Sequence, residues 1–197
     1  MFLQYLLGFR QLGWRVLFVD EIAPESCVDE AGRRCAFEES LNAQSTIAIM
    51  QRFGLGECYA LHCGEAQLGL ERKQVIEHLR DSAFLLNVMG FLRDEELLAA
   101  APRRVFLDID PGFGQMWREL GLSDIFAGHD QFVTIGENIG KPDCEVPTCG
   151  IEWITTFQPV VLEYCPEPEA PVYDGFTTIA NWRGYGSIEH ERVFYGQ

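Results

Sequence analysis

Two aspartates, Asp108 and Asp110, follow an apolar run that opens at Val105. Residues two apart on a strand point to one face, so both carboxylates are expected to face the same way. Paired carboxylates at a strand end can bind a divalent cation, or act as a nucleophile with an acid–base partner. Alternatively, one of them caps a helix that begins at Pro111, because proline is favoured at the first helical position.

A histidine and an aspartate, His129 and Asp130, stand next to each other in a loop entered through Gly128. Imidazole can accept a proton near neutral pH, and a carboxylate can fix its tautomer. We therefore predict His129 as a general base with Asp130 as its partner. The alternative is that His129 only forms hydrogen bonds within its loop.

Two further stretches could bind a ligand. The glycines of Gly136–Gly140 expose backbone N–H groups that could cradle a phosphate or a sugar hydroxyl. Trp182 and Arg183 combine an aromatic face, on which sugars stack, with a guanidinium that binds carboxylate or phosphate in bidentate fashion. The alternative for the second stretch is a buried tryptophan with a structural arginine.

Seven cysteines form an odd set, without the even framework of a small secreted domain. Cys58 and Cys63 have the same spacing as Cys144 and Cys149, which raises the possibility of a zinc site. Matching histidine pairs are lacking, and zinc ligands are commonly spaced more closely. We therefore predict no metal and no cofactor, and interpret the cysteines as reduced thiols of a cytoplasmic protein.

Helical and extended patterns alternate along the first half of the chain, which predicts a doubly wound, Rossmann-like, mostly parallel α/β sheet. Helices are expected over residues 2–12, 41–53, 70–80 and 94–100, and buried strands over 14–20, 58–61, 83–89 and 105–109. Further strands are expected over residues 132–135, 160–164 and 177–180, within a loop-rich C-terminal part.

The bulk composition limits the possible partners. The 197 residues suit a single domain, and 47% of them are hydrophobic. The net charge of −15 argues against nucleic acid and against anionic membranes, because both require clustered basic residues. No segment approaches the ~20 apolar residues that span a bilayer, so no membrane span is predicted.

Four stretches carry a resemblance to a known family: YLLGFRQLGWRVLFVDE, FLDIDPGFGQ, GHDQFVTIGENIGKPDCEVPTCGIEW and FTTIANWRGYG. Together they resemble an uncharacterised bacterial family of glycosyltransferase-like proteins. Such proteins are similar to the GT-B glycosyltransferases, which have two Rossmann domains. There the N-terminal domain mainly faces the acceptor, and the C-terminal domain binds the nucleotide-sugar donor.

The resemblance covers nearly all of residues 1–197 but only the N-terminal part of that architecture. It implies an acceptor-side domain truncated at both ends, without the opening strand and glycine-rich loop before Met1 and without the donor half after Gln197. It implies that His129 and Asp130 lie in the cleft, where we predict them as the catalytic residues. It also implies that the substrate contacts Asn138, Thr148, Cys149, Gly150, Trp182, Arg183 and Gly184. GT-B enzymes generally need no bound metal, which argues against Asp108 and Asp110 as metal ligands.

Two alternatives stay open beside this interpretation. The apolar run followed by Asp108 and Asp110 resembles the first motif of haloacid-dehalogenase-like phosphatases, and implies a metal-dependent phosphatase with Asp108 as nucleophile. The downstream Ser/Thr, lysine and acidic pair of that family are not matched. The second alternative is a non-catalytic module that binds carbohydrate or a partner through Trp182 and Arg183.

Overall fold

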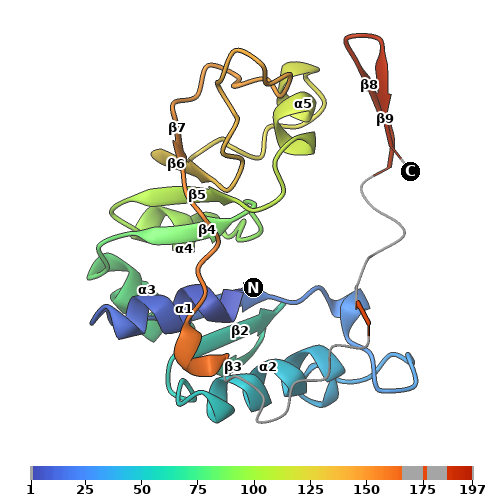
Figure 1. Cartoon of the computed structure of the whole chain (residues 1–197). Helices are drawn as coiled ribbons and strands as arrows, with labels where there is room; N and C mark the ends of the chain where they lie inside the picture. The colour runs from blue at the N-terminus through green and yellow to red at the C-terminus, as the bar shows by residue number, and fades with distance from the viewer. Residues whose placement is uncertain (1, 166–174, 177–185, 197) are drawn as a thin grey trace.

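The computed structural model describes residues 2–165, 175–176 and 186–196 (Figure 1). Its helices are α1 (Phe2–Gln11), α2 (Leu41–Arg52), α3 (Arg72–Arg80), α4 (Glu95–Ala100) and α5 (Phe113–Glu119). Its strands are β1 (Phe18–Glu21), β2 (Tyr59–Cys63), β3 (Ala66–Gly69), β4 (Leu85–Val88), β5 (Arg104–Asp108), β6 (Gln131–Thr134), β7 (Trp153–Thr155), β8 (Ile188–His190) and β9 (Val193–Tyr195).

The strands form three sheets. In the first, β1 pairs in parallel with β2, and β2 pairs in antiparallel fashion with β3. The second contains β4, β5, β6 and β7 in that order, all parallel. The third is the hairpin of β8 and β9. The mixed α/β architecture with an all-parallel sheet confirms the predicted Rossmann-like fold class.

Helices cover both faces of the first sheet. Successive residues of β2 point to opposite faces, and each face packs against different helices. Tyr59 and Leu61 pack into a core with Leu7 of α1 and Met50 of α2. Ala60, between them, is fully buried in a second core with side chains of α3 and α4. The second sheet has an aromatic core around Phe106.

The helix starts follow local hydrogen-bonding rules. The Ser40 hydroxyl accepts the Ala43 N–H at the start of α2, and the Asp94 carboxylate accepts the Leu97 N–H at the start of α4. Among the described residues, no helix is both long and apolar enough to cross a membrane.

Some predicted elements differ from the structure. Residues 160–164 were predicted as a strand but contain a 3₁₀ helix, Leu162–Tyr164, which closes when the Tyr164 N–H bonds to the Val161 carbonyl. This segment returns to α1, where the Val161 N–H donates to Gln4 at 2.7 Å. The sequence did not predict β3 or β7. The strand predicted over residues 177–180 lies outside the described residues.

Candidate functional site

The carboxyl end of β5 carries a buried carboxylate, that of Asp108, which is 1% exposed. Its Oδ2 accepts hydrogen bonds from Gln115 Nε2 at 2.6 Å and from the Thr134 hydroxyl at 3.0 Å. Its Oδ1 accepts the backbone N–H of Asp110 at 3.1 Å. Burial raises the pKa of Asp108, and these donated bonds partly oppose the rise. Asp108 therefore joins β5, α5 and β6 at one point.

The second aspartate lies in a different environment. The strand β5 ends at Asp108, so the strand alternation does not extend to Asp110, which is exposed. Helix α5 begins at Phe113, after Gly112 rather than at Pro111. Within the described part of the chain, no group of three or more His, Cys, Asp or Glu side chains is placed to hold a metal ion. These observations give the phosphatase alternative no support.

The loop that follows β6 folds back onto α5. The Cys149 thiol donates to the Gln115 carbonyl at 3.1 Å, and Cys149 has a positive φ of 55°. The Trp153 indole N–H donates to the Thr148 carbonyl at 3.2 Å. Burial raises the pKa of Cys149, and the bond that its thiol donates joins the loop to α5. Three predicted binding residues, Thr148, Cys149 and Gly150, thus stand beside the Asp108 network.

The start of the same loop packs on the loop that follows β5. A β-carbon placed on Gly136 would lie 3.1 Å from Cβ of Pro111 and 2.9 Å from the Ile139 side chain. Ile139 itself is buried. Residues 110–112, 136–141 and 148–150 therefore form one packed unit, which we call the carboxyl-edge rim.

The exposed surface of the rim is polar and mainly acidic. Asn138 is exposed, and its side-chain oxygen accepts from Lys141 Nζ at 3.0 Å. Asp110, Glu137 and the nearby Asp143 are exposed as well. This charge balance favours a neutral ligand with hydroxyl groups over a phosphate.

The predicted catalytic pair lies at the amino end of β6, whereas the rim lies beyond the carboxyl ends of β5 and β6. Asp130 accepts from the Arg104 backbone N–H at 2.7 Å and from the Arg104 guanidinium at 2.9 Å. Hydrogen bonds from Arg104 lower the pKa of Asp130. Asp130 thus joins β5 to β6 and has Arg104, rather than His129, as its partner.

His129 is half-buried against the aromatic core, with its ring centroid 5.2 Å from that of Phe106. Its Nδ1 lies 3.1 Å from the Phe126 carbonyl, and its Nε2 lies 3.0 Å from Asn87 Nδ2. A neutral ring protonated on Nδ1 satisfies both contacts. Burial lowers the pKa of His129, which favours this neutral form.

The structure therefore places the predicted residues in separate regions. Four predicted residues belong to the rim: Asn138, Thr148, Cys149 and Gly150. His129 and Asp130 lie at the opposite end of β6, and four extended residues separate the two ends by roughly 13 Å. Trp182, Arg183 and Gly184 lie outside the described residues.

Sequence reasoning missed two residues, Gln115 and Thr134. Gln115 stands at the third position of α5, and its side-chain oxygen accepts the Gly112 N–H at 2.8 Å. This is only half of a capping box, because glycine at the N-cap has no side chain to accept a bond in return, so the sequence lacks the usual signature. Thr134 is adjacent to Asp108 through the register of β5 and β6, which only the folded sheet reveals.

Comparisons with known proteins returned no match to any family model, curated protein or solved structure. The site geometry therefore carries the functional argument.

Proposed function

We propose that this chain is the acceptor-side domain of a GT-B-like glycosyltransferase, which transfers a sugar from a nucleotide-sugar donor to a hydroxylated acceptor. The observation that carries this proposal is the carboxyl-edge rim. It is fixed by Asp108 and exposes amide, hydroxyl and carboxylate groups beside a parallel sheet. Ligands of open α/β sheets bind beyond the carboxyl ends of the strands, where this rim lies.

Positioning is the main contribution that such a rim can make. Asp108, Gln115 and Thr134 hold the loops after β5 and β6 through buried hydrogen bonds, so the rim needs little ordering when it binds. In the proposal, the side chains of Asn138 and Thr148 bind acceptor hydroxyls. The acidic surroundings disfavour the donor diphosphate, which would instead meet helix N-termini of a second domain.

The proposal assigns acceptor binding to the rim and keeps His129 as the predicted base, without Asp130 as its partner, because Asp130 bonds to Arg104. The lowered pKa keeps His129 neutral, as a base requires. No contact of His129 with the rim supports this role, because its two ring nitrogens face Asn87 and Phe126.

Two measurements test the proposal. Isothermal titration of the chain with UDP-glucose and GDP-mannose should detect little binding, and micromolar binding of either would refute the assigned division of labour. Saturation-transfer NMR against a panel of neutral oligosaccharides should detect contacts that weaken severalfold in Asn138→Ala. The matched control is Asn42→Ala, an exposed asparagine on α2. Equal weakening in both variants would refute the rim as the binding surface.

A further inference from the structure

Two thiols from distant parts of the sequence meet at the carboxyl end of the first sheet. Sγ of Cys27 lies 3.8 Å from Sγ of Cys63, although the two positions are 36 apart in the sequence. Both cysteines are free thiols. Cys63 is the last residue of β2, and Cys27 lies in the loop that joins β1 to α2. The sequence spacing that relates Cys63 to Cys58 therefore does not identify its neighbour in the fold.

The loop after β1 turns back at once and holds Cys27 against the core. The Ile22 N–H still bonds to the β2 segment, at the His62 carbonyl, and the 3₁₀ helix Pro24–Ser26 follows. The Cys27 N–H then closes this turn on the Pro24 carbonyl at 3.3 Å. The Cys27 side chain is 2% exposed and belongs to the core shared with α1 and α2. The fold therefore fixes this thiol beside the end of β2.

The separation of the two sulfurs is that of atoms in van der Waals contact. A disulfide has an S–S bond of about 2.05 Å and Cβ atoms about 3.5–4.5 Å apart. The Sγ atoms of Cys27 and Cys63 must therefore approach each other by about 1.8 Å. Rotation about a Cα–Cβ bond and a small shift of the loop supply such a movement, because a loop yields more readily than a paired strand.

The two thiols differ in exposure, which sets the order in which they react. Cys27 is buried, whereas Cys63 is half-buried, so an external disulfide reaches Cys63 first. Burial raises the pKa of Cys63, as do its contact with Cys27 and the nearby carboxylates of Glu38 and Glu25. Since the thiolate is the nucleophile in thiol–disulfide exchange, the reaction should be faster in mildly alkaline solution than at neutral pH.

The surroundings of this thiol pair are acidic, which selects among small disulfides. Glu25 and Glu38 are exposed and lie close enough to Cys63 to act on its charge. The whole chain carries a net charge of −15. A negatively charged disulfide such as glutathione disulfide is therefore repelled, and a disulfide that carries amines is attracted. The favoured chemical class is a small cationic disulfide.

We propose that Cys27 and Cys63 form a reversible dithiol centre, which exchange with a small cationic disulfide, RSSR, oxidises to a disulfide. Cys63 loses its proton to solvent, and its thiolate attacks one sulfur of RSSR and displaces one RS⁻. The Cys27 thiolate then attacks Sγ of Cys63 and displaces the second RS⁻. The two protons released by the protein protonate the two leaving thiolates, so one disulfide forms as the other is reduced.

The consequence is a cross-link between the loop over residues 22–40 and β2. Loops beyond the carboxyl ends of parallel strands are the ligand-binding side of an open α/β sheet. Oxidation of Cys27 and Cys63 would therefore fasten a loop on that side of the first sheet, and reduction would release it. This inference is independent of the proposed glycosyltransferase function, because it rests on the two sulfurs and their surroundings alone.

A third thiol, that of Cys35, is an alternative partner for Cys27. The Cys35 N–H donates to the Cys27 carbonyl at 3.2 Å, and the bridge between Val28 and Arg34 keeps the two cysteines opposite each other. The direct contact of sulfur with sulfur favours Cys63 instead. The position of the bond therefore decides between the two partners.

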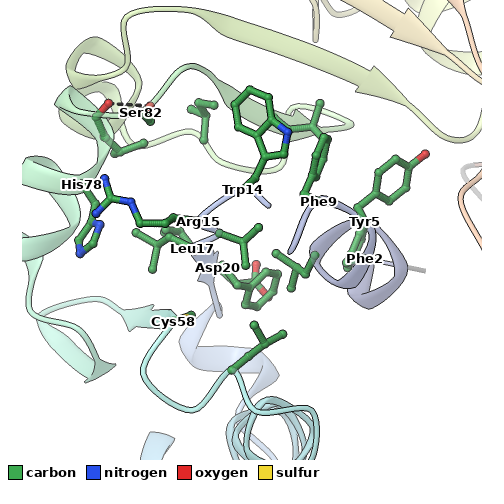
Figure 2. A pocket seen from close by; sticks show the side chains of 18 of the residues that line it. Phe2, Tyr5, Phe9, Trp14, Arg15, Leu17, Asp20, Cys58, His78 and Ser82 are labelled. Carbon is green, nitrogen blue, oxygen red and sulfur yellow. Dashed lines mark hydrogen bonds between the residues drawn. The ribbon is translucent and has the colours of Figure 1, made fainter. Parts of the chain in front are cut away.

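Cys58 provides a matched control. It is half-buried like Cys63 and directly precedes β2. It lines a cavity of about 730 Å³, together with Trp14 and Asp20 (Figure 2). Neither Cys27 nor Cys63 is among the described residues that line this cavity. Cys58→Ser therefore removes a thiol close to β2 and leaves the dithiol centre in place.

The first test maps the bond formed when the reduced chain is incubated with cystamine, a small cationic disulfide. Trypsin cleaves after Arg33 and Arg52, so Cys27, Cys35 and Cys63 fall in different peptides. The experiment uses Cys58→Ser as well as the parent chain, because Cys58 and Cys63 share a peptide. Unreduced digests of both proteins should contain the Cys27 peptide joined to the Cys63 peptide. A bond between Cys27 and Cys35 would overturn the proposal.

Variants separate the two steps of the exchange. Cys27→Ala should stop at a mixed disulfide that retains one cysteamine on Cys63, whereas the parent chain should lose two thiols and retain none at this pair. Urea should suppress formation of the Cys27–Cys63 bond, since the folded chain brings the two sulfurs together. Cysteamine retained on Cys63 in the parent chain, or a bond that forms equally in urea, would contradict the proposal.

Two further readouts report the preference and the effect of the cross-link. Glutathione disulfide at equal concentration should oxidise the pair severalfold more slowly than cystamine, and equal rates would refute the assigned preference for a cationic disulfide. Oxidation should raise Tm by about 5–10 °C, because the bond closes a loop of the unfolded chain, and dithiothreitol should reverse the rise. An unchanged Tm would show that the bond does not fasten the loop.

Discussion

At the scale of single residues, the buried side chain of Asp108 links the rim to the second sheet. It accepts three hydrogen bonds, and its donors come from α5, from β6 and from the chain just beyond β5. A buried carboxylate without such donors would be expensive, since desolvation opposes its charge. Its role is therefore to fix the loops that follow β5 and β6.

Replacement of this carboxylate by an amide should destabilise the fold. Asp108→Asn puts an N–H₂ group opposite either the Gln115 amide or the Asp110 N–H, so one buried donor loses its acceptor. We expect a loss of about 1–3 kcal/mol in the free energy of unfolding, measured with urea. The exposed Asp110→Asn is the control and should change stability by less than about 0.5 kcal/mol. Comparable losses in both variants would show that Asp108 does not fix the loops.

The sequence showed where this network would be but not what it would do. The apolar run identified β5, and the two aspartates identified its end as polar. The partners of Asp108 are distant in sequence, at Gln115 and Thr134, and only sheet register and helix packing bring them near. Likewise, neighbouring positions suggested a pair at His129 and Asp130, whereas the side chains have separate partners.

At the scale of elements, the β2–β3 hairpin depends on the absence of a side chain at Gly69. Gly69 has φ of 84°, and a β-carbon there would lie 2.3 Å from the Tyr59 carbonyl oxygen. Gly64, in the turn of the same hairpin, also has positive φ, but nothing lies within 4 Å of its added β-carbon. A side chain at Gly64 would therefore cause backbone strain alone, whereas a side chain at Gly69 would cause both strain and steric overlap.

Alanine substitutions at these glycines should differ in cost. Gly64→Ala incurs only the strain of a left-handed residue, about 1–2 kcal/mol. Gly69→Ala adds an overlap with backbone, so we expect an additional loss of about 1–3 kcal/mol. Thermal or urea unfolding of the two variants measures the difference. Similar losses would indicate that the hairpin shifts to accept the new methyl group.

The hairpin also illustrates which elements could be predicted. Helix α3 and strand β2 have clear patterns, and both were expected near their observed positions. The strand β3 reads AQLG, which is short and lacks β-branched residues, so its extended form follows from pairing with β2. Local preference predicts the long periodic elements, and tertiary contact decides the short ones.

At the scale of the whole molecule, each of the two larger sheets contains a histidine whose pKa is lowered. His129 packs on the second sheet, and burial is the main cause of its shift. His62 belongs to β2 of the first sheet, where burial and the nearby Arg72 lower its pKa. The Nε2 atom of His62 is buried without a hydrogen-bond partner in the described part of the chain. Folding therefore disfavours the protonated form of both rings.

These shifts predict how stability depends on pH. A histidine pKa lowered by folding means that the unfolded chain binds more protons, so the free energy of unfolding rises with pH. The contribution is complete above the unfolded pKa of about 6.5 and is lost as pH falls through the folded pKa values. Asp20 and Asp108, whose pKa values burial raises, oppose this trend toward acidic pH. All the proteins compared below retain both aspartates, so the difference in slope between a variant and the parent chain reports the histidine alone.

We therefore expect His62→Gln and His129→Gln each to flatten the rise in unfolding free energy between pH 5 and 7, relative to the parent chain. Asn42→Ala, an exposed position on α2, removes no titratable group, so it should leave the slope unchanged and serves as the control. Urea titrations at fixed ionic strength measure all four proteins. If neither His62→Gln nor His129→Gln changes the slope, the two rings accept protons as readily in the folded protein as in the unfolded chain. Burial of the His62 and His129 rings would then not lower their pKa values.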